Sequence, residues 1–246
     1  MTVRRVNTGY FSKRESLFVH FAVCRLPRWI TPDHLTAFAA FGALMTCAGL
    51  ICCWMSGWFL LLVFAGLAAN WVGDSLDGAL ARYRKEERHR VGFLLDRTSD
   101  VLSFFLIIVA LGLSPYMTHH SSLMLLLAYL LHTIYTVMRI VVDGVHHIGL
   151  GGIGATEGRT LVGSWAAVGQ FAGRDVVEFR VGDIIVFDVV STCLLVGAFC
   201  IFAVRVASDV RRIGRFEGVQ EFRRPSGMSS SIVVPINRAA RSGPDA

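Results

Sequence analysis

The sequence has few charged residues. Only 17% of its 246 residues are Asp, Glu, Lys or Arg, whereas a soluble domain of this size usually carries about a quarter. Hydrophobic residues make up 54% of the chain, and its mean hydropathy is +0.55. This composition argues against an ordinary soluble domain and indicates an integral membrane protein.

The sequence also lacks a cysteine framework and a clear signal peptide. Its six cysteines form no C-x-x-C pair, and most of them lie in apolar runs, which predicts reduced cysteines and no thiolate zinc site. The apolar run LFVHFAVC near the start is short and contains a histidine, so it does not form a signal-peptide core. We expect an amphipathic helix at the membrane interface within residues 1–33 instead.

Long apolar runs are plentiful, and six of them reach the roughly 17–25 residues that a helix needs to cross a bilayer. No internal repeat of the kind found in inverted-repeat transporters is visible. The predicted fold is an all-α integral membrane protein with a six-helix domain at 34–206 and a basic, disordered tail at 207–246. The expected helices cover residues 34–55, 58–83, 92–113, 121–143, 154–173 and 184–206.

Basic residues are distributed unevenly around these six runs. Of the 24 Lys and Arg residues, all but Arg174 and Arg180 fall on the side that holds both termini and the junction between the second and third helices. The positive-inside rule places that side in the cytoplasm, in a membrane of the bacterial cytoplasmic type. The net charge of +6 then indicates attraction to anionic lipid headgroups, with no nucleic-acid partner.

Four aspartates interrupt the apolar sequence at that junction, in the stretch DSLDGALARYRKEERHRVGFLLDRTSD, residues 74–100. Asp74 and Asp77 are three residues apart, and Asp96 and Asp100 are four apart, so each pair shares one helix face. The second and third helices run antiparallel, so we expect the two pairs to lie at a similar depth and converge. Four facing carboxylates repel one another, and two divalent cations would balance their charge.

An all-carboxylate site suits Mg²⁺ or Mn²⁺ better than zinc or copper. The alternative is that the aspartates form salt bridges with nearby arginines at the helix ends. We favour the metal site because acids within membrane segments usually serve a function. Gly78 and Gly92 remove side chains beside the two acid pairs, which would let a ligand approach the backbone. Arg82, one turn after Gly78, is suited to a phosphate oxygen.

This stretch resembles the signature of the CDP-alcohol phosphotransferase family, D-x2-D-G-x2-A-R-x8–9-G-x3-D-x3-D. All fixed positions match, and the six-helix layout is similar as well. These positions are Asp74, Asp77, Gly78, Ala81, Arg82, Gly92, Asp96 and Asp100.

The resemblance implies a transferase of phospholipid biosynthesis. Such an enzyme moves a substituted phosphate from a CDP-linked donor to an alcohol and releases CMP, with a lipid as donor or acceptor. The resemblance implies that Asp74, Asp77 and Asp96 hold the metals and the donor pyrophosphate, while Asp100 completes the metal site and acts as the base. The residues that would line the CDP pocket are Gly78, Ala81, Arg82 and Gly92.

Three further charged residues are candidates for acceptor or headgroup contacts. Glu157 and Arg159 open the fifth helix on the same side as the aspartates. Thr156-Glu157 resembles an element of choline/ethanolamine phosphotransferases, although the two charges could equally neutralise each other at the helix start. The eukaryotic members of that group have histidine directly after the third aspartate, where this chain has Arg97. Arg97 is therefore a candidate for a lipid or donor phosphate.

Two other classes of protein compete with an enzyme. A cation or proton transporter would place its acids near the middle of the bilayer, often on broken helices, whereas these acids cluster beside a basic loop. A scaffold without catalysis fits poorly with the complete aspartate set. The sequence does not decide whether the donor is CDP-diacylglycerol or a CDP-aminoalcohol, and it does not identify the acceptor alcohol. For the oligomeric state, we consider a homodimer.

Overall fold

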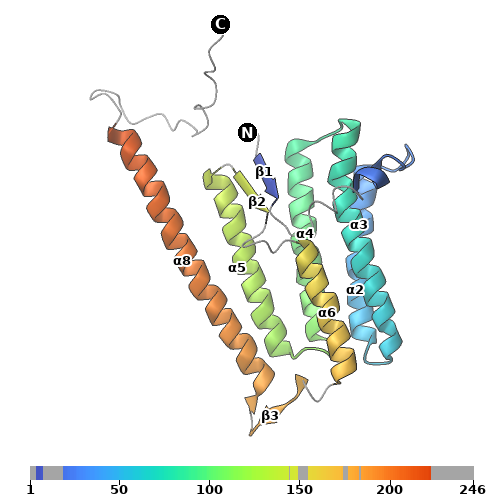
Figure 1. The fold of residues 1–246 in the computed structure, drawn as a ribbon. Coiled ribbons are helices and arrows are strands. Elements are labelled where there is room, and N and C mark those ends of the chain that lie inside the picture. Colours follow the sequence, from blue (N-terminus) through green and yellow to red (C-terminus); the bar gives the residue numbers. More distant parts are fainter. Residues whose placement is uncertain are drawn as a thin grey trace. The chain divides into compact units, whose positions relative to one another are not determined.

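The computed structural model describes residues 4–7, 19–143, 145–148, 155–173, 177–182 and 184–222 (Figure 1). The chain divides into two compact units, Met1–Phe199 and Cys200–Ala246. Helices dominate the described residues, and a 3-10 helix (Gly57–Phe59) precedes the second long helix. The long helices are α2 (Pro32–Cys52), α3 (Leu60–Arg84), α4 (His89–Gly112), α5 (His119–Asp143), α6 (Ala155–Ala172) and α8 (Val186–Phe222).

The helices coincide with the six apolar runs, and the all-α prediction holds apart from two short strand pairs. β1 (Arg4–Asn7) pairs in parallel with β2 (Val145–Ile148), and β3 (Arg180–Val181) pairs antiparallel with β4 (Ile184–Ile185). Among the described residues, four helical segments are long and apolar enough to cross a membrane, so the protein is an integral membrane protein. These segments are Pro32–Cys52, Gly57–Arg84, His119–Arg139 and Val186–Gly214.

Helices α4 and α6 are long but carry charged residues. The first half of α4 carries Asp96, Arg97 and Asp100, and the start of α6 carries Glu157 and Arg159. Charged side chains are costly in hydrocarbon, and these residues keep both helices out of the group of four apolar segments. A count of six membrane spans therefore stays a prediction.

Two expectations for the ends of the chain differ from the structure. Residues 4–7 form strand β1 and residues 19–23 a short helical segment, so an N-terminal amphipathic helix is not confirmed; residues 8–18 lie outside the described part. The tail expected to be disordered from 207 instead begins as helix, because α8 continues to Phe222. Helix propagation adds a hydrogen bond per residue, and no proline occurs between the start of α8 at Val186 and Pro225. Residues 223–246 are outside the described part.

Helix α2 organises the first unit. Thr31 caps its start by accepting a hydrogen bond from the backbone N–H of His34 at 3.3 Å, and Pro32 occupies the first turn, where its missing N–H costs nothing. The helix packs extensively against α3 and also against α4, while α4 packs on α5 and α6 packs on α3. Among the described residues, α3 and α4 contact each other little, so α2 bridges the two helices that carry the aspartates.

Glycines allow α2 and α3 to approach closely. A Cβ atom at Gly42 would lie 2.3 Å from the backbone N of Asn70, and one at Gly73 would lie 2.6 Å from the backbone N of Ala39. Real Cβ atoms do not come this close to another backbone, so these positions require glycine at the observed separation. This small-residue packing, which Ala39 and Ala43 also join as buried residues, is typical of membrane helices.

The described residues of this unit form two apolar core clusters. One includes Val63 and Leu67 of α3 with residues of α2, α4 and α6, and the other includes Leu76 and Leu80 of α3 with Val23 and Leu35. Asn70 and Asp74 follow the first cluster and precede the second along α3. A polar layer therefore lies between two apolar ones, which limits the water that reaches it.

Candidate active site

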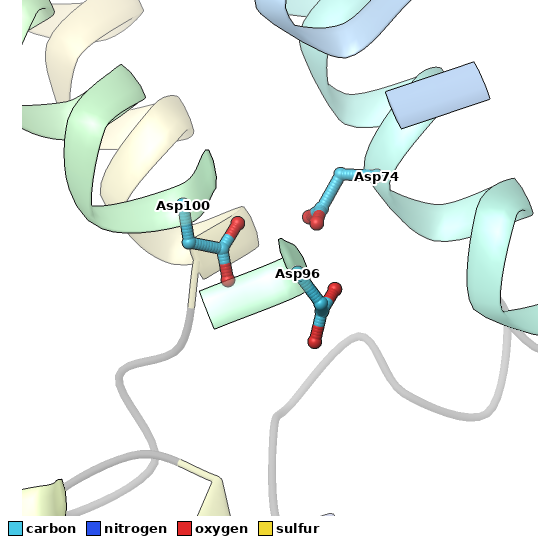
Figure 2. Close-up of side chains that lie close together, drawn as sticks. All are labelled: Asp74, Asp96 and Asp100. Atoms are coloured by element: carbon cyan, nitrogen blue, oxygen red, sulfur yellow. The ribbon is translucent and has the colours of Figure 1, made fainter. Parts of the chain in front are cut away.

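Three of the four signature aspartates come together. Carboxylate oxygens of Asp74, Asp96 and Asp100 lie within 4.8 Å of one another, and all three side chains are partly buried. Figure 2 shows Asp74 on α3 facing Asp96 and Asp100 on α4 across the space between the helices. The predicted convergence of the two pairs is thus present for these three residues, although the helices themselves do not pack closely.

Asp77 lies outside this group of three. It is buried, its Oδ2 accepts a hydrogen bond of 2.7 Å from Thr36 Oγ1 of α2, and its Oδ1 accepts one of 2.5 Å from the backbone N–H of Gly78. Hydrogen bonds to a carboxylate fix the direction of its oxygens. Both oxygens of Asp77 are therefore engaged, one by α2 and one by its own helix.

Arg159 enters the cluster from α6. Arg159 is only 4% exposed, and its Nη2 lies 2.8 Å from Asp74 Oδ2 and 3.9 Å from Asp100 Oδ1. Its Cζ lies 5.6 Å from the centre of the Phe104 ring on α4. A buried arginine is stable only when it is paired and hydrogen-bonded, so Arg159 forms part of the site's structure.

Asn70 holds the other side of this guanidinium and was not anticipated from the sequence. Arg159 Nε donates to Asn70 Oδ1 at 2.6 Å, and Asn70 Nδ2 donates to the carbonyl oxygen of Ala39 at 2.8 Å. Asn70 precedes Asp74 by four residues within an apolar segment, and this spacing was the signal that could have identified it. Thr36 was missed for a different reason, since a threonine near a helix start carries no such signal.

Arg97 and the two signature glycines have different surroundings. Arg97 Nη1 lies 3.8 Å from Asp100 Oδ2, so a second positive charge stands beside this carboxylate. A Cβ at Gly78 would meet only Arg82 Nη1, at 3.3 Å, and one at Gly92 would meet nothing within 4 Å. These two glycines are not required by helix packing, unlike Gly42 and Gly73.

Glu157 lies in the first turn of α6, but its side chain is outside the described part of the structure. Ala81 is partly buried near the end of α3, and Arg82 is exposed there. The helix ends at Lys85, which adopts a left-handed conformation with φ 59°. Arg84 fixes this end by donating to the carbonyl oxygens of Ile30 at 2.5 Å and Pro27 at 2.9 Å.

The chemistry of the cluster fits a divalent cation. Three carboxylates with oxygens within 4.8 Å of one another form an all-oxygen donor set, which hard ions such as Mg²⁺ or Mn²⁺ prefer. Asp74, Asp96 and Asp100 would hold such an ion. The neighbouring arginines offer donors for phosphate oxygens.

These features define a helical membrane protein with a candidate site for cations and phosphates. A protein-family model, CDP-alcohol phosphatidyltransferase, matches residues 29–154, just over half of the 246 residues. The chain belongs to the CDP-alcohol phosphatidyltransferase family, whose members are phospholipid-synthesis transferases of phosphate-containing groups. The match includes α2 to α5 and all four aspartates, and it ends just before α6. No curated protein matches the chain.

Proposed function

We propose that the protein transfers a substituted phosphate from a CDP-linked donor to an alcohol, with release of CMP, and that a lipid is one of the two substrates. The observation that carries this proposal is the meeting of Asp74, Asp96 and Asp100 from two helices of a membrane protein of this family. The donor is CDP-diacylglycerol or a CDP-aminoalcohol. The membrane domain is residues 34–206, with six spans and its active site on the cytoplasmic side.

The transfer itself needs charge neutralisation and alignment more than covalent help from the protein. The acceptor oxygen forms a bond to phosphorus, the bond from that phosphorus to the CMP oxygen breaks, and CMP leaves. We assign to the Asp100 carboxylate the proton that the alcohol loses. This assignment is supported by the position of the Asp100 carboxylate, which has an oxygen within 4.8 Å of those of Asp74 and Asp96.

Two Mg²⁺ or Mn²⁺ ions held by the signature aspartates would stabilise the charge on the diphosphate. The donor pocket would be formed on the loop side of the cluster, where Gly78 and Gly92 leave room beside the backbone. Arg82 and Ala81 complete this pocket in our proposal. Arg97 and Glu157 are proposed to contact the acceptor or its headgroup. Arg159 would do the same if its ion pairs with Asp74 and Asp100 opened.

The decisive experiment supplies purified protein with labelled CDP-diacylglycerol and, in separate reactions, with CDP-choline or CDP-ethanolamine. Each donor is offered with a panel of alcohols, including diacylglycerol for the CDP-aminoalcohols, and CMP release is measured. Product formation with one donor class identifies the lipid as donor or acceptor. Absence of CMP with every combination, from protein that remains folded, would refute the proposed activity.

Removal of divalent cations tests the metal requirement. We expect EDTA to stop CMP release, because the carboxylates would then repel the negatively charged diphosphate. Added Mg²⁺ or Mn²⁺ should restore the rate of CMP release. Ca²⁺ accepts a looser coordination geometry than Mg²⁺, so failure of Ca²⁺ to restore the rate would show that the site requires the stricter geometry. Activity that is indifferent to EDTA would contradict the metal assignment.

A further inference from the structure

Arg159 raises a question that the transfer reaction does not answer. The acid cluster already needs positive charge from metal ions, yet the chain places a permanently charged and almost fully buried guanidinium group against it. Arginine is not deprotonated in proteins, so its charge is present whether or not a metal is bound. A cation coordinated by Asp74 and Asp100 would have to tolerate this charge at close range.

The contacts show that Arg159 faces the same carboxylates a metal would use. Its Nη2 is 2.8 Å from Asp74 Oδ2 and 3.9 Å from Asp100 Oδ1, so one nitrogen lies near carboxylates of both α3 and α4. Without it, the three carboxylates of the cluster would repel one another across less than 4.8 Å. The guanidinium group therefore offsets the repulsion within the metal-free cluster.

Asn70 determines where the guanidinium group points. Its Nδ2 is engaged by the carbonyl oxygen of Ala39 on α2, so its Oδ1 faces Arg159 Nε at 2.6 Å. An asparagine amide has its donor and acceptor on opposite branches, and fixing one branch fixes the other. The close approach of α2 and α3 supplies that fixed point, because Ala39 also lies against Gly73.

We infer that Arg159, positioned by Asn70, is a built-in counter-cation of the acid cluster: it stabilises the carboxylates before a divalent cation arrives and weakens the binding of that cation. Asn70 and Arg159 are positioning residues in this inference. It rests on the proposed function only in treating the cluster as a cation site. The measurements below need no substrate.

The test measures Mn²⁺ affinity of the full-length protein in detergent, from the electron paramagnetic resonance signal of free Mn²⁺. Arg159→Gln should bind Mn²⁺ about tenfold or more tightly than the unaltered protein, because like charges a few ångströms apart interact strongly even at an effective dielectric constant near 20. The metal-free variant should unfold at a lower temperature, and Mn²⁺ should raise that temperature more than it does for the unaltered protein. Arg180→Gln removes the same charge from an exposed strand residue and should leave both quantities unchanged.

Asn70→Leu tests the positioning step. This variant keeps the charge of Arg159 but removes the acceptor of its Nε, so Mn²⁺ binding should tighten by less than in Arg159→Gln. In the Arg159→Gln background the same change should have no further effect on affinity, because a residue that acts through another is not additive with it. A purely structural asparagine would change affinity equally in both backgrounds.

The inference is overturned if Arg159→Gln binds Mn²⁺ with unchanged or lower affinity. It is also overturned if the unaltered protein binds no Mn²⁺ at millimolar concentrations. If Arg159→Gln does not fold, Asn70→Leu alone decides, and unchanged or weaker binding again refutes the inference. Failure of every CDP donor to yield CMP would refute the proposed function and leave these Mn²⁺ results standing.

Discussion

Four aspartates of one signature occupy different surroundings. Asp74 is paired with a buried arginine, Asp77 is hydrogen-bonded to a threonine, and Asp100 stands between two arginines at longer range. The regular spacing of the acids in the sequence hides these differences, because spacing fixes a helix face and not the partners on other helices. Each aspartate should therefore respond differently to substitution.

Asp100 is the residue whose loss should affect the chemical step most directly. Asp100→Asn retains the size of the side chain but cannot accept the alcohol's proton, so we expect CMP release to fall by roughly 10²–10⁴-fold. The protein should remain folded, as checked by its elution from a sizing column in detergent. The rate is measured with the donor that the unaltered protein uses.

Asp33→Asn is the matched control for this substitution. Asp33 is exposed in the first turn of α2 and forms an ion pair with Arg88 on the loop side of the membrane domain. Exposed ion pairs contribute little to stability, so we expect near-normal activity. Normal turnover in Asp100→Asn would remove Asp100 from the role of base.

Gly92 should be needed for the substrate and not for the fold. A Cβ added there meets no atom within 4 Å, so Gly92→Ala should stabilise α4 by about 0.5–1 kcal/mol through helix propensity. If the donor approaches the backbone here, the KM for the CDP donor should rise nonetheless. A steady-state titration of the donor measures the change.

Gly197 provides a control of the same kind. It lies within α8, and a Cβ there also meets no atom within 4 Å. Gly197→Ala should give a similar gain in thermal stability without a change in KM. A Gly92→Ala variant with unchanged KM would place the donor pocket elsewhere.

At the scale of the helices, α2 determines the geometry of the site although it carries none of the signature residues. It contacts both α3 and α4, and it supplies Thr36 to Asp77 and the Ala39 carbonyl oxygen to Asn70. The aspartates of α3 and α4 are therefore held at their separation largely through a third helix. The separation of α2 from α3 should consequently affect both stability and activity.

Gly73→Ala tests this dependence. The new Cβ would lie 2.6 Å from both the backbone N of Ala39 and the carbonyl oxygen of Leu35, so the two helices must move apart. Overpacking of this kind costs about 1–3 kcal/mol, and the Asn70 hydrogen bond to Ala39 would lengthen with it. We expect lower thermal stability together with lower CMP release, measured on the same preparation.

Gly197→Ala again separates a general effect of glycine replacement from one of helix spacing. It should raise the unfolding temperature slightly, whereas Gly73→Ala should lower it. A Gly73→Ala protein with unchanged stability and activity would show that α2 does not set the position of the acids.

The sequence predicts the elements better than their partners. Apolar runs locate the six long helices, and the i, i+3 and i, i+4 spacings correctly predict that acids from two helices meet. The partners of Asp77 and Asp74 could not be predicted, because Thr36 and Arg159 lie far from them in the sequence and are joined to them only by helix packing. The extension of α8 to Phe222 was missed because its polar composition resembles a disordered tail.

At the scale of the whole molecule, the number of membrane spans is the open structural prediction. Four segments of the described residues satisfy length and composition, whereas α4 and α6 carry charged residues near one end. Charged residues near the end of a membrane helix can be accommodated when they face protein, as Asp100 and Arg159 do here. We therefore expect α4 and α6 to cross the membrane as well.

The loop at residues 113–118 distinguishes six spans from four. If α4 crosses, and the junction between α3 and α4 is cytoplasmic as we propose, this loop lies outside the cytoplasm and α5 returns, so the chain after Asp143 is cytoplasmic. If α4 does not cross, both locations are exchanged. In a bacterial host, alkaline phosphatase fused after Ser114 should be active, and the enzyme fused after Asp143 inactive, because it folds only outside the cytoplasm, where its disulfides form.

Two further fusions keep the result interpretable. With the start of α2 on the cytoplasmic side, as we propose, the connection after Met55 lies outside in both arrangements and the loop at Glu87 inside in both, because α2 and α3 are both long and apolar enough to cross. Activity after Met55 and none after Glu87 would validate the reporter. An inactive fusion after Ser114 with an active one after Asp143 would establish four spans. The acids of α4 would then lie on a helix at the membrane surface. The site would have to draw its lipid substrate from the interface.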